Sequence, residues 1–194
     1  MKFEYPSGAT PLDPDEIEGL MPFHIATLAE LNEWEALNIL QSEGWAFSIS
    51  HRVGFLERDF IQLLHKKMFN NTWRWAGKFR KTNKNIGSDY SLITMELENL
   101  LADVKFQILK NSFSIDEIAY RFHHRLVKIH PFPNGNGRHA RMMTDIFLVQ
   151  SGRLRFSWGS EQLGIASSIR ENYIRALKHA DKHDYSALSL FVRS

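Results

Sequence analysis

The residues best suited to chemistry gather in one short segment, residues 130–141, which reads HPFPNGNGRHAR. Pro131 and Pro133 restrict the backbone and stop a preceding helix. Gly135 and Gly137 permit positive φ angles and let the backbone come close to a ligand. The N–H groups of such a loop can converge on an anion at the positive end of the next helix dipole. The segment therefore predicts an anion-binding loop at a helix N-terminus.

Three side chains beside this loop could act on the anion. Arg138 and Arg141 lie within one helical turn, so both guanidinium groups can face the same phosphate. His130, at the end of the preceding helix, is a candidate general base. Without the loop, the histidine would be interpreted as a helix-terminal residue and the arginines as surface ion-pair partners. Together with the loop, they predict a site for phosphate chemistry.

The composition is that of a globular protein. The chain has 194 residues, of which 43% are hydrophobic and 24% charged, so it is long enough for one domain with a core. The net charge of +2 argues against binding of nucleic acid by the whole surface. The absence of cysteine excludes disulfides, thiolate metal sites and a cysteine nucleophile. The sequence shows neither a membrane-spanning run nor a signal-peptide core, so we expect a cytoplasmic protein.

Hydrophobic periodicity predicts an all-α fold with one small β-hairpin. Thr27 with Glu30, and Ser114 with Glu117, have the spacing of capping boxes at helix N-termini. Gly44 suits the exit from the first of these helices. Helices are expected at about residues 27–42, 56–69, 94–108 and 114–130, then from the loop to residue 152, and finally at 165–180 and 188–191.

Two segments lack helical periodicity. Residues 1–24 contain several prolines and indicate an arm that wraps the body or extends from it. Residues 78–93 indicate a short two-stranded hairpin. Its simplest interpretation is a solvated charged hairpin, on which lysine discourages edge-to-edge association. The hairpin would carry four cations: Lys78, Arg80, Lys81 and Lys84.

Residues 130–141 also resemble the signature of the Fic family, H-P-F-x-[D/E]-G-N-[G/K]-R-x-x-R. They depart from it at Asn134, where the family usually has Asp or Glu. Residues 125–129 and 172–177 are similar to Fic sequences as well. Residues 73–80 resemble a Fic subgroup called mobile mystery protein B.

This resemblance covers most of the chain beyond about residue 50. It implies a Fic-like helical bundle with a hairpin flap, formed by residues 51–194. Residues 1–50 would form an N-terminal arm and helix that pack on this core. We expect a single globular unit overall.

The resemblance implies a protein adenylyltransferase, which moves AMP from ATP to a Ser, Thr or Tyr hydroxyl of a target protein. His130 would take the proton from that hydroxyl. Backbone N–H groups would hold the α- and β-phosphates, Arg138 the phosphate tail and Arg141 the γ-phosphate. The implied nucleotide-binding residues are Asn134, Gly135, Asn136, Gly137, Arg138 and Arg141.

Magnesium is the implied metal ion. An acidic residue at position 134 would bind Mg²⁺ bridging the phosphates, whereas Asn134 offers one neutral oxygen and predicts weaker metal use. Asn134 could instead act only as a helix N-cap. His123, His124 and His139 do not have the spacing of a zinc motif with His130, so we interpret them as surface or supporting residues.

The resemblance gives the hairpin a second interpretation, as a flap whose edge accepts a segment of the target as an extra strand. That strand would place a hydroxyl over the active site, and the basic charge would favour acidic targets. The implied docking residues are Lys78, Phe79, Arg80, Lys81 and Thr82.

Many Fic proteins carry an inhibitory helix with the pattern [S/T]-x-x-x-E-[G/N], whose Glu pairs with the last signature arginine. No segment here matches: Glu30 has Ala26 four residues before it, and Glu43 has Ile39. Glu30 and Glu33 are therefore interpreted as a helix cap and a solvated face, with an inhibitory role for Glu30 left open. A separate antitoxin-like partner could supply the missing glutamate.

Other functions stay open. The same site could transfer phosphocholine or phosphate, although Gly137 stands where kinase-like Doc members have Lys and so favours AMP transfer. A weakened metal position would also fit a nucleotide-binding or partner-binding module without catalysis. Nucleic-acid binding rests only on the hairpin lysines and would require steep salt dependence.

Overall fold

The computed structural model describes residues 11–50, 54–160 and 166–194, and within these ranges the fold is all-α, as predicted. A 3₁₀ turn, η1 (Tyr90–Leu92), precedes the fourth helix. No helix in the described ranges is long and apolar enough to span a membrane. The helices are α1 (Pro14–Ile17), α2 (Leu28–Ser50), α3 (Arg58–Phe69), α4 (Ile93–Lys110), α5 (Ile115–Ile129), α6 (Asn136–Gln150), α7 (Ala166–Ala180) and α8 (Ser186–Val192).

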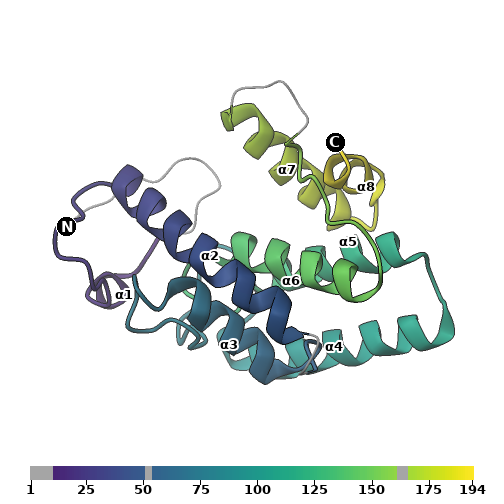
Figure 1. The fold of residues 1–194 in the computed structure, drawn as a ribbon, viewed down its shortest axis with the longest axis horizontal. Coiled ribbons are helices and arrows are strands. Elements are labelled where there is room, and N and C mark those ends of the chain that lie inside the picture. Colours follow the sequence, from purple (N-terminus) through teal and green to yellow (C-terminus); the bar gives the residue numbers. More distant parts are fainter. Residues whose placement is uncertain (1–10, 51–53, 161–165) are drawn as a thin grey trace.

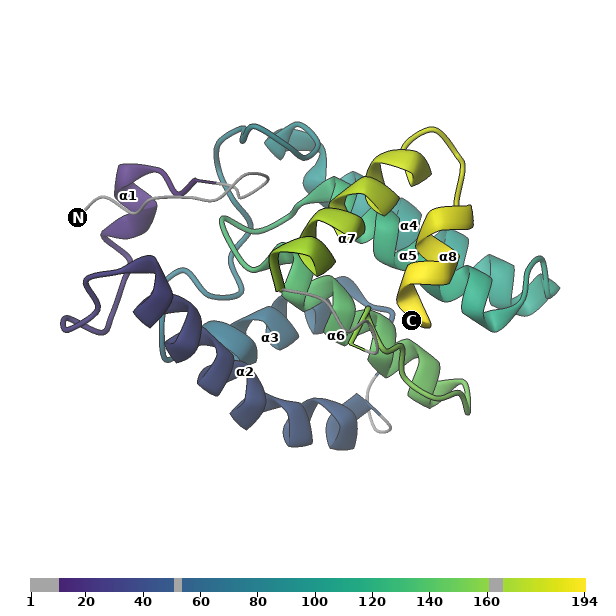
Figure 2. The same ribbon diagram turned by 90° about the horizontal axis from the view of Figure 1, so that it is seen from above.

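Helices α5 and α6 pack against each other at the centre of the molecule (Figure 1). Helices α2 and α3 pack together and contact α6, whereas α4 packs on α5. Helices α7 and α8 form a second pair, and α8 contacts α5 (Figure 2). The loop of residues 130–135 joins the two central helices, so elements from both sides of the bundle can reach it.

Apolar side chains fill the space between α5 and α6. Phe122 and Phe147 are fully buried, with ring centroids 6.4 Å apart in an edge-on arrangement. Leu126 and Met143 are buried with them. Each such side chain contributes on the order of 2 kcal/mol by leaving water. Because the 130–135 loop connects these helices, their packing fixes both of its ends.

The caps predicted at Thr27 and Ser114 are confirmed. Thr27 Oγ1 accepts a hydrogen bond from the N–H of Glu30 at 3.2 Å, and the Glu30 carboxylate accepts one from the N–H of Thr27 at 2.9 Å. Ser114 Oγ accepts a bond from the N–H of Glu117 at 3.2 Å at the start of α5. Local polar chemistry therefore sets these two N-termini.

The predicted exit of α2 at Gly44 is wrong, since the helix continues to Ser50. The reason is tertiary packing beyond the glycine. Trp45 stacks on Phe60 of α3 with ring centroids 6.4 Å apart, and Ala46 is fully buried. These contacts outweigh the low helix propensity of one glycine.

The β-hairpin predicted for residues 78–93 is also wrong, because this segment consists of bends and irregular backbone followed by η1 and α4. The side chains of Asn83 and Asp89 accept the N–H groups of nearby residues, which competes with a cross-strand ladder. Arg80 and Lys84 turn inward rather than lying on a strand edge. We call residues 78–89 the turn segment.

Candidate active site

His130 ends α5 with its backbone in the left-handed region, at a φ of 54°. Its Nδ1 lies 3.3 Å from the carbonyl oxygen of Val127. Since a carbonyl can only accept, Nδ1 carries the proton of the neutral ring. Burial lowers the pKa of His130 to about 4. The ring is therefore neutral at pH 7 with Nε2 unprotonated, as a general base requires.

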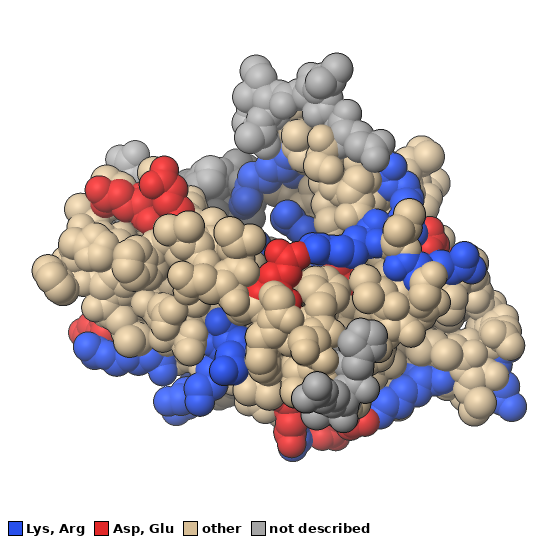
Figure 3. Space-filling view, viewed as in Figure 1, with Lys and Arg blue, Asp and Glu red and all other residues tan. Residues whose placement is uncertain are grey.

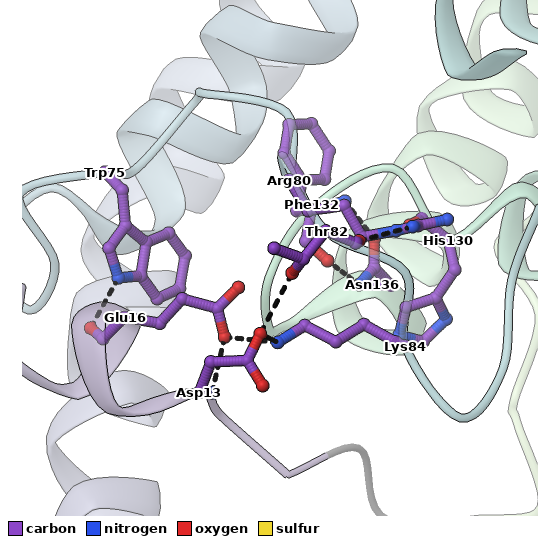
Figure 4. Close-up of polar contacts among 9 residues, drawn as sticks. All are labelled: Asp13, Glu16, Trp75, Arg80, Thr82, Lys84, His130, Phe132 and Asn136. Carbon is purple, nitrogen blue, oxygen red and sulfur yellow. Dashed lines mark hydrogen bonds and ion pairs between the residues drawn. The ribbon is translucent and has the colours of Figure 1, made fainter. Parts of the chain in front are cut away.

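The guanidinium group of Arg80 fixes the main chain around His130 (Figure 4). Its Nε donates to the carbonyl oxygen of His130 at 2.7 Å, and Nη2 donates to that of Ile129 at 3.3 Å. The Arg80 N–H donates to the carbonyl oxygen of Pro131 at 2.9 Å. These carbonyls follow the negative end of the α5 dipole, where a cation is favourable. The sequence predicted Arg80 on an exposed hairpin. In the structure it is only 3% exposed and positions the candidate base.

Asn136 and His65 hold the middle of the 130–135 loop. The Asn136 side chain accepts the N–H of Phe132 at 2.9 Å and donates to its carbonyl oxygen at 2.7 Å. The His65 ring stacks on Phe132 with centroids 3.7 Å apart. Its Nδ1 accepts the N–H of Gly77 at 3.0 Å, so Nε2 donates to the Asn134 carbonyl oxygen at 3.0 Å. Burial holds the pKa of His65 well below its usual range, so the ring stays neutral at neutral pH.

The N-terminus of α6 has the features of an anion site. Gly135 is its N-cap residue at a φ of 78°, and no side chain caps the helix. The first N–H groups, from Asn136 to Arg138, have no intrahelical acceptor. A Cβ at position 135 would lie 2.4 Å from the ring of Phe69, so glycine is required by space as well as by conformation.

Arg138 is held by an acidic residue that the sequence patterns do not single out. Glu35 of α2 is fully buried, and its Oε2 lies 2.7 Å from Nη2 of Arg138. Its Oε1 accepts the indole N–H of Trp73 at 2.6 Å and the side-chain amide of Asn134 at 3.2 Å. One buried carboxylate therefore contacts two of the implied nucleotide-binding residues.

Arg141 lies against α7 rather than α2. Its guanidinium carbon is 5.0 Å from the centre of the Tyr173 ring, and the Tyr173 hydroxyl lies 2.8 Å from Nε2 of His123. A Cβ at Gly137 would lie 3.9 Å from that hydroxyl. Burial raises the pKa of Tyr173 and lowers that of His123 to about 3, so both are neutral at pH 7. Arg138 thus contacts α2, whereas Arg141 contacts α7. Figure 3 shows Lys and Arg side chains around a hollow between these two helices.

The N-terminal arm is tied to the turn segment (Figure 4). Nζ of Lys84 lies 2.7 Å from Oδ2 of Asp13 and also pairs with Glu16, and the Lys84 side chain is only 3% exposed. The Thr82 hydroxyl donates to Asp13 at 2.9 Å, and the indole N–H of Trp75 donates to the Glu16 carbonyl oxygen at 2.9 Å. The bond from Lys84 is the main cause that lowers the pKa of Asp13. The described part of the arm wraps the body, whereas residues 1–10 lie outside the described residues.

The implied docking residues divide by exposure. Lys78, Lys81 and Thr82 are exposed. Phe79 is half-buried, with its ring 5.5 Å from that of Phe132. With Arg80 and Lys84 turned inward, two of the four expected cations remain on the surface of the turn segment.

Glu30 acts as a helix cap. Its exposed carboxylate accepts the N–H groups of Ala26 at 2.8 Å and Thr27 at 2.9 Å, and these bonds lower its pKa. The acidic group that α2 brings to the 130–135 loop is Glu35.

No set of three or more His, Cys, Asp or Glu side chains is placed to hold a metal ion among the described residues. The histidines considered for such a site have other partners. Nε2 of His139 lies 3.0 Å from the Ile61 carbonyl oxygen, and Nε2 of His124 lies 3.1 Å from Asp181.

Residues 55–148 match the model of the Fic/DOC family. A probable protein adenylyltransferase of Aquifex aeolicus is 37% identical over 76 residues, which are 38% of this chain and 21% of that protein. The protein adenylyltransferase Fic of Drosophila grimshawi is 28% identical over 152 residues, 75% of this chain and 29% of that protein. The matched segments therefore span less than a third of these relatives.

Solved Fic structures share the fold. The BepC protein of Bartonella tribocorum, with bound AMPPNP, aligns with a TM-score of 0.68 and 16% identity over 93% of this chain and 97% of that chain. Fic-1 of Caenorhabditis elegans aligns with a TM-score of 0.66 and 22% identity over 91% of this chain and 51% of that chain. A VirB-translocated effector domain of Bartonella quintana, with bound ADP, aligns with a TM-score of 0.65 and 18% identity over 88% of this chain and 86% of that chain.

Proposed function

We propose that this chain, in which residues 55–148 form a Fic/DOC family domain, is a protein adenylyltransferase that moves AMP from ATP to a protein hydroxyl. One observation carries the proposal: a single loop joins a buried neutral histidine, His130, to the uncapped N-terminus of α6. A base beside an anion cradle is what transfer to a hydroxyl needs. The relatives that match are named protein adenylyltransferases, which supports the same activity.

His130 would accept the proton of the target hydroxyl at Nε2 while the hydroxyl oxygen attacks the α-phosphate. The new oxygen–phosphorus bond forms as the bond between the α- and β-phosphates breaks, and pyrophosphate leaves. Because the pKa of His130 lies at about 4, the ring is ready to act as a base at pH 7. Arg80 would keep the ring in place through the His130 carbonyl.

The phosphates would lie on the first turn of α6. The N–H groups of residues 136–138 would donate to phosphate oxygens, at the positive end of the helix dipole. Arg138 would exchange its contact with Glu35 for the phosphate tail. Arg141 would hold a further phosphate oxygen through its guanidinium group, whose buried Nε has no hydrogen-bond partner among the described residues.

A divalent cation fits beside Asn134. The Asn134 side-chain nitrogen donates to the fully buried Glu35 carboxylate at 3.2 Å, so a cation there would meet that negative charge, and a half-turn of the amide would present its oxygen. When bound, Mg²⁺ would spread the negative charge of the phosphates during the displacement. Asn134 would offer its neutral side-chain oxygen to that ion.

The turn segment is the proposed docking site for the target. It runs beside His130, since the N–H groups of Arg80 and Ser88 donate to the carbonyl oxygens of Pro131 and Ile129 at 2.9 and 3.3 Å. An extended target segment could bond to its exposed main chain. The exposed Lys78 and Lys81 would favour acidic residues near the modified hydroxyl.

The test uses two forms of ATP, one labelled at the α-phosphate and one at the γ-phosphate. The purified protein is incubated with each, with Mg²⁺ and a cell lysate, and protein-bound label is measured. Label from the α-phosphate alone, lost in His130→Ala and kept in the exposed control His179→Ala, is the expected result. Label from the γ-phosphate would show phosphate transfer, and ATP binding without any label would show a binding module.

A further inference from the structure

Glu35 stands out because it is a fully buried carboxylate with one incomplete contact. Its side chain is 1% exposed, and Oε2 lies 2.7 Å from Nη2 of Arg138 without a well-aligned hydrogen bond. Its Oε1 is bonded to Trp73 and Asn134. A buried charge needs a partner of opposite sign, and Arg138 is that partner here.

A bound triphosphate would change this balance. The phosphate tail competes for Arg138, which is the charge that compensates Glu35. A buried carboxylate beside phosphates would then repel them, because little water screens the two charges. A cation between the carboxylate and the phosphates would remove this repulsion.

We propose that Glu35 is a ligand of the divalent cation that accompanies the nucleotide, and that it supplies the carboxylate that the 130–135 loop lacks at Asn134. This inference rests on the proposed nucleotide-binding function. It assigns to α2, a helix far away in the sequence, a charge that the signature places within the loop. Mg²⁺ in nucleotide sites is commonly bound by one or two carboxylates, and Glu35 would be one of them.

The distance between the two side chains fits adjacent ligands. The Asn134 amide nitrogen lies 3.2 Å from Oε1 of Glu35. A half-turn of the amide exchanges its nitrogen for its oxygen. Neighbouring ligands in an octahedral Mg²⁺ shell, with bonds of about 2.1 Å, lie about 3.0 Å apart.

The remaining ligands would come from phosphate oxygens and water. Among the described residues no cluster of three or more acidic or histidine side chains could hold a metal without them. Mg²⁺ characteristically keeps several waters and binds substrate phosphates as well as protein. The site is therefore expected to bind the cation tightly only together with the nucleotide.

The test measures Mn²⁺ binding by electron paramagnetic resonance, with the full chain and AMPPNP. The variants are Glu35→Gln, Asn134→Asp and the double variant, and Glu33→Gln is the control because Glu33 is exposed on the same helix. Glu35→Gln should weaken Mn²⁺ binding at least about tenfold. Asn134→Asp should restore it in the double variant by returning a carboxylate to the site, and Glu33→Gln should leave it unchanged.

Unchanged Mn²⁺ affinity in Glu35→Gln would overturn the proposal. So would tighter AMPPNP binding without metal at unchanged Mn²⁺ affinity, because Glu35 would then only compete for Arg138. If Glu35→Gln does not fold, Glu35→Asp decides, because it keeps the charge but withdraws the carboxylate from Asn134: weaker Mn²⁺ binding than wild type supports the proposal, and unchanged binding overturns it. AMPPNP binding by the wild type without any AMP transfer would contradict the proposed activity while the Mn²⁺ result still stands.

Discussion

Mild acid is expected to destabilise this protein strongly, because four histidine rings are buried in their neutral form. His65, His123, His130 and His139 are each at most 7% exposed. Burial lowers the pKa of His123 and His139 to about 3 and that of His130 to about 4, and it holds the pKa of His65 well below its usual range. In the unfolded chain the same rings titrate near a pKa of about 6.5.

The sign and size of the effect follow from proton linkage. Between about pH 7 and pH 5 the unfolded state binds a proton at each ring and the folded state does not, so the free energy of unfolding falls as pH falls. This loss integrates to about 2 kcal/mol for each ring, and to on the order of 6 to 8 kcal/mol for the four. The total stability of a domain is about 5 to 15 kcal/mol, so much of it would be lost by pH 5. His124 adds less, since its contact with Asp181 opposes the effect of burial on its pKa.

The assay is urea unfolding followed by circular dichroism at about pH 7, 6 and 5, with the free energy of unfolding extrapolated to water. Replacing His179, whose side chain is 53% exposed, by Gln should leave the loss caused by the four buried rings in place. Replacing the buried His123 by Gln should reduce it by about one ring's share. A total change smaller than the roughly 2 kcal/mol of a single histidine would contradict the burial of four neutral rings.

Three further substitutions or conditions have defined outcomes. Arg80→Met should lower the free energy of unfolding by about 3 to 5 kcal/mol, because the buried carbonyls of Ile129 and His130 lose their donors. It should also lower kcat more than it raises KM for ATP. An unchanged free energy of unfolding in urea would contradict this expectation. Gly135→Ala should cost about 2 to 4 kcal/mol and abolish ATP binding measured by calorimetry, since it strains a φ of 78° and meets the Phe69 ring. The pH profile of kcat/KM should show no inflection between about pH 8 and 6, because the pKa of His130 lies at about 4; an inflection near 6.5 would show a solvated ring.

Features set by neighbouring residues could be predicted from the sequence. The caps at Thr27 and Ser114 depend on residues three positions away, and they form as expected. The 130–135 loop likewise follows from its own prolines and glycines, with Gly135 at positive φ. The end of α2 could not be predicted in this way, because contacts with α3 carry the helix past Gly44.

Features set by distant residues could not be predicted. Glu35 is 99 positions from Asn134, and nothing in its immediate sequence indicates their contact. A weak signal was present, since Glu35 lies four residues after Leu31 and three before Asn38 on the buried face of α2. A carboxylate in such a position needs a buried partner. The inward orientation of Arg80 could not be predicted either, because its hydrogen-bond acceptors are main-chain carbonyl oxygens of another element.

We propose that this protein joins AMP to a hydroxyl by means of His130. The most direct measurement is mass spectrometry of a modified target, or of the protein itself, after reaction with ATP and Mg²⁺. We expect one added AMP on a Ser, Thr or Tyr side chain, formed by the wild type and by His179→Ala but not by His130→Ala. An AMP adduct that His130→Ala still forms, or an adduct of phosphate alone, would contradict it.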